Sequence, residues 1–213
     1  MIMFLKQLLN TIFNKSYNEF DFKLDEKNIL QRQICILKNG LNSQYTCYSA
    51  FVYKDKIREL IHFYKFQKKV YLSKVIAKIL YDLIVEKMPQ IVDSPEKFEL
   101  VCVPCHCFRV FKRGFNHMSL VCKELQKLLK IKFNQKLIIR SKYTPSLYNK
   151  TKKEREAIIN GCFKIKNSKT KNTNTKIILI DDILTSGTTM KECIKTLNDN
   201  GFENVYPFTV AST

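Results

Sequence analysis

The feature that most constrains this chain is an apolar run that leads directly into two acids and a hydroxyl-rich turn. The run covers residues 177–180 and is followed by Asp181 and Asp182. The turn consists of Thr185, Ser186, Gly187, Thr188 and Thr189. A short continuous apolar segment of this kind is typical of a parallel strand that is buried on both faces. Apolar spacing then predicts a helix from about residue 189 to residue 197, so the segment predicts an α/β domain.

The acids and the turn together suit a ligand that carries both hydroxyl groups and a phosphate. Carboxylates accept hydrogen bonds, so Asp181 and Asp182 can hold vicinal sugar hydroxyls. Backbone N–H groups at a helix start, helped by hydroxyl donors and the positive end of the helix dipole, bind a phosphate. Gly187 allows close approach of the backbone because it has no Cβ. The structural alternative is a buried strand that leads into a capped helix and binds nothing.

Residues 177–189 resemble the 5-phosphoribosyl-1-pyrophosphate (PRPP) motif of type I phosphoribosyltransferases. The shared order is apolar residues, two acids, apolar residues, and then Thr-Ser/Thr-Gly-Thr/Ser-Thr. The resemblance implies that Asp181 and Asp182 hold the ribose 2′- and 3′-hydroxyls and that the turn holds the 5′-phosphate. It also implies Mg²⁺ as the cofactor that accompanies PRPP, without assigned protein ligands. For a pentosyltransferase, the candidate catalytic residues are Asp181, Asp182 and Arg113.

The remaining pattern predicts one doubly wound α/β domain. Further strands are expected at residues 48–53, 98–103, 137–139 and 205–210. A helix is expected at residues 116–129, with others between the strands. Residues 48–213 are therefore assigned to a phosphoribosyltransferase-like domain with a mostly parallel central sheet flanked by helices. Residues 1–47 are assigned to a small helical N-terminal extension, because apolar residues recur there at helical spacing.

A basic loop after the strand at residues 98–103 is the second candidate site. It contains Cys105, His106, Arg109 and Arg113. In an open α/β sheet, ligands bind where such loops leave the carboxyl ends of the strands. The guanidinium groups of Arg109 and Arg113 suit pyrophosphate through charge-assisted bonds, and His106 can add a donor. The structural alternative is a hydrogen-bonded histidine beside two solvated arginines.

The same loop is similar to the signature of one branch, the ComF-type competence proteins, which include the GntX-like proteins. That signature is Val-Pro-x-His, a basic spacer and Arg-Gly-Phe-Asn-Gln, and this chain has His117 in the last position. Leu147 and Ile158 also depart from the glutamine and asparagine usual in the branch. The resemblance implies a role in DNA uptake during natural competence. Candidate partners are single-stranded DNA and inner-membrane DNA-uptake proteins.

Cysteine spacing argues against a zinc site, although the chain has eight cysteines. Only Cys102, Cys105 and Cys107 are close together, and a structural zinc site usually takes two close ligand pairs. No C-x-x-C pair precedes Tyr48, so the zinc finger common in ComF-type proteins is not expected here. The sequence therefore predicts a protein without stoichiometric zinc.

Charge and hydropathy narrow the function classes without choosing one. The formal charge is +18, but only six of the 37 basic residues are arginine, and abundant lysine is also typical of A/T-rich genomes. No apolar run reaches 18 residues and the start lacks a secretory signal, which predicts a cytoplasmic protein that can lie at the inner membrane. Three functions stay open: a phosphoribosyltransferase, a non-catalytic PRPP- or nucleotide-sensing module, and a single-stranded DNA-binding component of the uptake machinery.

Overall fold

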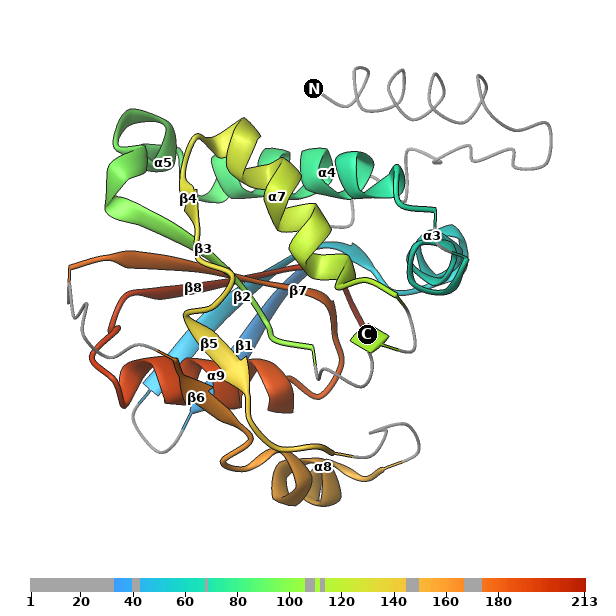
Figure 1. Ribbon diagram of the computed structural model, residues 1–213, viewed down its shortest axis with the longest axis vertical. Coiled ribbons are helices and arrows are strands. Elements are labelled where there is room, and N and C mark those ends of the chain that lie inside the picture. Colours follow the sequence, from blue (N-terminus) through green and yellow to red (C-terminus); the bar gives the residue numbers. More distant parts are fainter. Residues whose placement is uncertain are drawn as a thin grey trace.

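The computed structural model describes residues 33–39, 43–67, 69–105, 110–111, 114–144, 150–166 and 174–213. Within these residues a mostly parallel six-stranded sheet has helices on both faces (Figure 1). Its strands are β1 (Gln33–Asn39), β2 (Ser43–Val52), β3 (Phe98–Cys102), β4 (Lys132–Phe133), β7 (Lys176–Leu184) and β8 (Val205–Ser212). The helices are α3 (Asp55–Phe66), α4 (Leu72–Lys87), α5 (Gln90–Asp93), the 3-10 helix η1 (Pro95–Lys97), α7 (His117–Leu129), α8 (Lys152–Ile159) and α9 (Thr188–Asn198).

The strand order β1-β2-β8-β7-β3-β4 places β7 in the interior of the sheet. β7 pairs in parallel with β8 on one side and with β3 on the other. β2 and β4 extend the parallel pairing, and β1 is antiparallel to β2 at the edge. Because the strands beside β7 run in its direction, their carboxyl ends lie along the same edge, where open α/β sheets bind ligands.

Two apolar layers explain why β7 is a continuous apolar run. Ile178 belongs to the core under α3, α4 and α7, and Leu179 belongs to the core on the opposite face with α9. Residues 177–180 all have 0% of their surface exposed. In Figure 1, α4 and α7 cover one face of the sheet and α9 covers the other. A strand that is covered on both faces needs apolar side chains at every position, whereas a half-exposed strand alternates.

A small antiparallel pair, β5 (Ile138–Arg140) and β6 (Phe163–Ile165), carries α8 between its strands. Thr151 caps α8 in a reciprocal arrangement. Its side chain accepts from the Glu154 backbone N–H at 3.3 Å, and the Glu154 side chain accepts from the Thr151 N–H at 2.7 Å. This capping box fixes where α8 begins, and α8 packs against α9.

The structure confirms a mixed α/β fold with a mostly parallel central sheet flanked by helices. The expected helix at residues 116–129 is α7, and Asn116 caps it by accepting from the Ser119 N–H at 3.2 Å. The first expected strand is β2, which begins at Ser43 rather than Tyr48. β1 joins the same sheet, so residues 33–39 and 43–47 of the assigned extension form strands there. The helix expected near the N-terminus lies outside the described residues.

None of the helices in the described part of the chain is long and apolar enough to cross a bilayer.

Candidate functional site

The carboxyl-terminal half of β7 and the start of α9 border a cavity of about 510 Å³. Residues 181–190, which include both acids and the whole hydroxyl-rich turn, line this cavity. Three cations from other elements also line it: Arg58 and Lys65 of α3, and Arg155 of α8. The cavity therefore combines carboxylates, hydroxyl donors and positive charge, which are the groups that a sugar phosphate requires.

The two acids are held in different ways. Asp182 Oδ2 lies 2.6 Å from Lys65 Nζ and 2.5 Å from His117 Nε2. Asp181 Oδ1 accepts a hydrogen bond from the Asp182 backbone N–H at 2.8 Å. Lys65 lies near the end of α3 and His117 is the first residue of α7. Three elements that are distant in the sequence thus meet at one carboxylate.

The pKa values of the two acids move in opposite directions. Burial, followed by the adjacent Asp182 carboxylate, raises the pKa of Asp181 to about 8. Burial also acts to raise the pKa of Asp182, but the Lys65 ammonium and the His117 imidazole outweigh it and hold that pKa well below its ordinary range. Two neighbouring buried carboxylates avoid carrying two charges in this way. Near pH 7 the pair therefore carries about one negative charge, which lies on Asp182.

The hydroxyl-rich turn has the geometry of a tight strand-to-helix connection. Gly187 has φ +72°, and an added Cβ would lie 2.6 Å from Leu37 Cδ2. The hydroxyls of Ser186 and Thr188 are 2.9 Å apart, and Arg155 donates to the Thr185 hydroxyl at 3.3 Å. The helix α9 begins at Thr188, one residue earlier than expected. The first turn of α9 therefore lies at the cavity, with the hydroxyls of the turn and the Arg155 guanidinium beside it.

The second candidate loop is described only in part. His106, Arg109 and Arg113 lie outside the described residues, and their pyrophosphate role stays a prediction. Cys105 is half-buried and lines a separate cavity of about 340 Å³ with Asn116 and the β5 residues. The Val103 N–H donates to the Ile180 carbonyl at 2.9 Å. The loop after β3 therefore leaves the sheet directly beside Asp181, as expected for neighbouring parallel strands.

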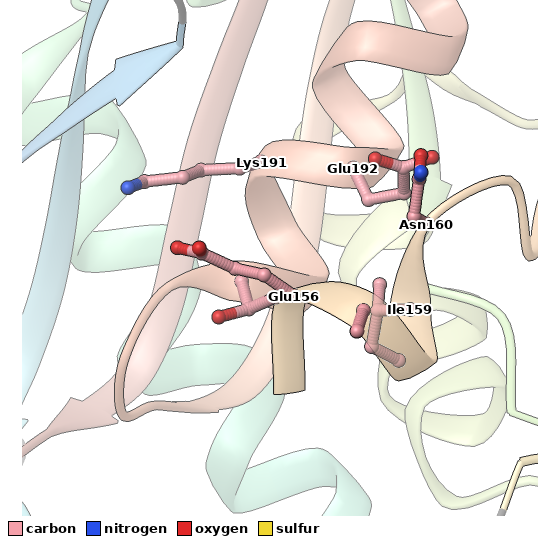
Figure 2. A pocket seen from close by; sticks show the side chains of 7 residues that line it. Glu156, Ile159, Asn160, Lys191 and Glu192 are labelled. Carbon is pink, nitrogen blue, oxygen red and sulfur yellow. The ribbon is translucent and has the colours of Figure 1, made fainter. Parts of the chain in front are cut away.

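A third cavity of about 410 Å³ lies between α8 and α9 (Figure 2). Its lining includes Glu156, Asn160, Lys191 and Glu192. Figure 2 shows Glu192 beside Asn160, with Lys191 directed away from them. Thr188 lines both this cavity and the 510 Å³ cavity. Two glutamates against one lysine make the third cavity the less suitable of the two for a phosphate.

Sequence reasoning did not assign Arg58, Lys65 or His117 to the site. Arg58 and Lys65 are seven residues apart, which is about two helical turns, so they share one face of α3. That spacing was a visible signal, but it does not reveal that the face meets β7. His117 was visible as the residue in place of glutamine, and its contact with Asp182 follows only from the packing of α7.

We expect the purified protein to contain no stoichiometric zinc. Cys102 is 4% exposed within β3, and the described residues contain no group of three His, Cys, Asp or Glu side chains placed to hold a metal. Elemental analysis of protein purified without chelator should find well below one zinc per chain. About one zinc per chain would contradict this expectation and would direct attention to Cys102, Cys105 and Cys107.

Fold and site together define the class of this protein. It is an α/β protein whose central parallel strand ends in an acid pair and whose next helix begins at a hydroxyl-rich turn, with both features facing one cavity. The ligand roles of residues 181–189 stay predictions.

Comparison with known proteins places this chain near competence proteins. It is 27% identical over 160 residues to competence protein F of Haemophilus influenzae. The matched segment covers 75% of this chain and 69% of that relative. The chain is 22% identical over 162 residues to the DNA utilization protein YhgH of Escherichia coli K12, which covers 76% of this chain and 69% of that relative. No family profile matches the chain. These two similarities support the assignment of this chain to a ComF-like competence family.

Proposed function

We propose that this chain is a ComF-like protein that binds PRPP in the 510 Å³ cavity and acts in DNA uptake. The observation that supports PRPP as the ligand is that Asp181, Asp182 and residues 185–189 all line one cavity. The names of the relatives, a competence protein and a DNA utilization protein, support the role in competence and DNA uptake.

Each part of PRPP has a matching group in this proposal. Asp181 and Asp182 accept hydrogen bonds from the ribose hydroxyls, because carboxylate oxygens are strong acceptors. Backbone N–H groups at the start of α9 and the hydroxyls of the turn bind the 5′-phosphate. Arg58, Lys65 and Arg155 add positive charge on the cavity wall, which favours a polyanionic ligand over a neutral sugar.

Mg²⁺ belongs to the proposal as a cation that arrives with the substrate. It prefers oxygen donors and keeps several waters, so it needs few protein ligands when phosphates supply the rest. The carboxylate and hydroxyl oxygens of the cavity suit such a hard cation. When bound, Mg²⁺ would neutralise part of the pyrophosphate charge, and the residues of this chain would orient the sugar.

Transfer of the phosphoribosyl group requires more than binding. If turnover occurs, orientation of the ribose and positive charge near the departing pyrophosphate are the contributions that the chain can make. Arg113 is the expected pyrophosphate contact, and it lies outside the described residues. A sensing module would bind PRPP without releasing pyrophosphate, so a pyrophosphate-release assay separates these two functions.

The test of PRPP binding is replacement of Asp181 by asparagine. At pH 8.5, above the pKa of Asp181, we expect D181N to weaken Mg²⁺-PRPP binding about 10- to 150-fold, because hydrogen bonds to a charged group contribute about 1.5–3 kcal/mol. The difference in PRPP affinity between D181N and the wild type should be smaller at pH 7, because Asp181 of the unliganded protein holds a proton there. Isothermal titration calorimetry measures both affinities.

The matched control is Glu156→Gln, which neutralises an acid in the adjacent cavity between α8 and α9. Its PRPP affinity should equal that of the wild type within about twofold, since exposed charges contribute little. Equal affinity of the wild type and D181N at pH 8.5 would remove the ribose-binding role of the acid pair. Absence of any PRPP binding by the wild type would remove the proposal itself.

A further inference from the structure

We infer that His117 is a positioning residue which, together with Lys65, holds Asp182 by one oxygen and leaves the other oxygen for a ligand hydroxyl. This inference rests on the proposed function, because it concerns the ribose end of the same site. It assigns a role in binding to His117, which is not one of the described residues that line the cavity.

Both contacts to Asp182 fall on the same atom. Lys65 Nζ and His117 Nε2 approach Oδ2 at 2.6 and 2.5 Å. Among the described residues, no hydrogen bond or ion pair reaches Asp182 Oδ1. Asp181 shows the same division, since its Oδ1 accepts from the Asp182 N–H and its Oδ2 has no contact of this kind in the described part of the chain. Each acid thus offers one uncommitted oxygen, and two such oxygens suit two neighbouring hydroxyls.

Water has little access to Lys65, His117 and the Asp182 carboxylate that they contact. The exposed fractions of the side chains are 16% for Lys65, 9% for His117 and 14% for Asp182. Low exposure strengthens the hydrogen bonds and keeps water from competing for Oδ2. Moving the carboxylate away would leave the largely buried Lys65 ammonium without its anionic partner, which opposes such a displacement.

The position of His117 is itself fixed by its surroundings. The Tyr64 hydroxyl donates to the His117 carbonyl at 2.5 Å, and the Tyr64 ring centroid lies 6.2 Å from the imidazole. Asn116 caps the helix start directly before it. α3 therefore contributes both Lys65 on the carboxylate and Tyr64 on the histidine that contacts the same carboxylate. These contacts set the Asp182 rotamer before a ligand arrives, which removes an ordering cost from binding.

The inference is tested with two amides of different reach. Glutamine at position 117 carries an N–H donor on a side chain long enough to reach Oδ2, whereas asparagine carries the same amide on a shorter stem. We expect His117→Gln to bind ribose 5-phosphate within about threefold of the wild type and His117→Asn to bind it about tenfold more weakly, which corresponds to loss of one charge-assisted hydrogen bond. Both variants should bind inorganic pyrophosphate as the wild type does, since that ligand has no hydroxyl for Asp182.

Calorimetry with ribose 5-phosphate and with pyrophosphate gives the six affinities of the wild type and the two variants, and thermal melts of both variants report folding. Equal ribose 5-phosphate affinity of the two variants would overturn the inference. Equal weakening toward both ligands would also overturn it, because that result indicates a structural role for His117. If the wild type binds neither PRPP nor ribose 5-phosphate, the proposed function fails, and this result differs from any outcome in which the wild type binds and the variants do not differ.

Discussion

Replacement of Asp182 by asparagine is expected to destabilise the folded protein by about 3–5 kcal/mol, the usual cost of removing one partner from a buried ion pair. The substitution keeps the side-chain volume and removes the negative charge that faces Lys65 and His117. The Lys65 ammonium would then remain in a largely buried place without its direct counter-ion, and His117 would lose its anionic hydrogen-bond partner. Urea unfolding at pH 8, followed by circular dichroism, measures the change in free energy.

Asp181→Asn should have the opposite effect on stability. The pKa of Asp181 is raised above its ordinary value to about 8, so the unfolded chain ionises this group at a lower pH than the folded protein does. The contribution of Asp181 to the stability of the wild type therefore falls as pH rises from about 4 to about 8, and D181N lacks this contribution. We expect D181N to be more stable than the wild type by about 2 kcal/mol at pH 8 and to be nearly equal to it near pH 4. The amide keeps an oxygen that accepts from the Asp182 N–H.

Asp182 contributes with the reverse sign, because its pKa is lowered in the folded protein. Its stabilisation is present above the ordinary aspartate pKa and is lost as pH falls through the lowered value. Asp93→Asn is the control, since this exposed acid should change stability by no more than about 0.5 kcal/mol. A D182N variant as stable as the wild type, or a D181N variant that is less stable at pH 8, would contradict the assignment of charge within the pair.

Gly187→Ala is the second substitution with a large expected effect, a loss of about 2–4 kcal/mol of folding free energy. A left-handed backbone with φ +72° costs a residue with a Cβ about 1–2 kcal/mol. The new methyl would also press against Leu37 Cδ2 at 2.6 Å, and overpacking of this kind costs about 1–3 kcal/mol. Either the Leu37 side chain or the turn must move to relieve the contact, and a movement of the turn would weaken the proposed phosphate binding as well. Denaturant unfolding and calorimetry with PRPP measure the two effects.

A matched glycine separates the backbone cost from the clash. Gly161 has φ +64°, but its added Cβ would meet only Lys142 Nζ at 3.5 Å, an ordinary contact. Gly161→Ala should therefore cost about 1–2 kcal/mol. In a Leu37→Ala background, Gly187→Ala should cost less than in the wild type, because the methyl that it meets is gone. An unchanged cost in that background would show that Leu37 does not set the requirement for glycine.

The two strands at one edge of the sheet, β1 and the first half of β2, were not predicted from the sequence. Residues 33–39 and 43–47 were assigned to an extension, and the structure pairs them as β1 and β2 with Cys35 opposite Cys47. The pair Asn39-Gly40 between two apolar stretches is a common hairpin sequence and could have predicted this connection. The helical spacing of apolar residues before these strands predicted a helical extension instead.

The local order of the site follows from the chain alone: a buried strand, two acids, a glycine-containing turn and a helix. These are neighbours in the chain, and each reports its environment through local rules such as the continuous apolar run of β7 and the need for glycine at φ +72°. Three features of the site come from the packing of distant elements. Lys65 and His117 meet on one oxygen of Asp182, Arg155 reaches Thr185, and the pKa of Asp181 is raised. The physical reason is that burial and the approach of charges from α3, α7 and α8 depend on how helices pack on the sheet, and residues this distant leave no local pattern of that packing in the chain.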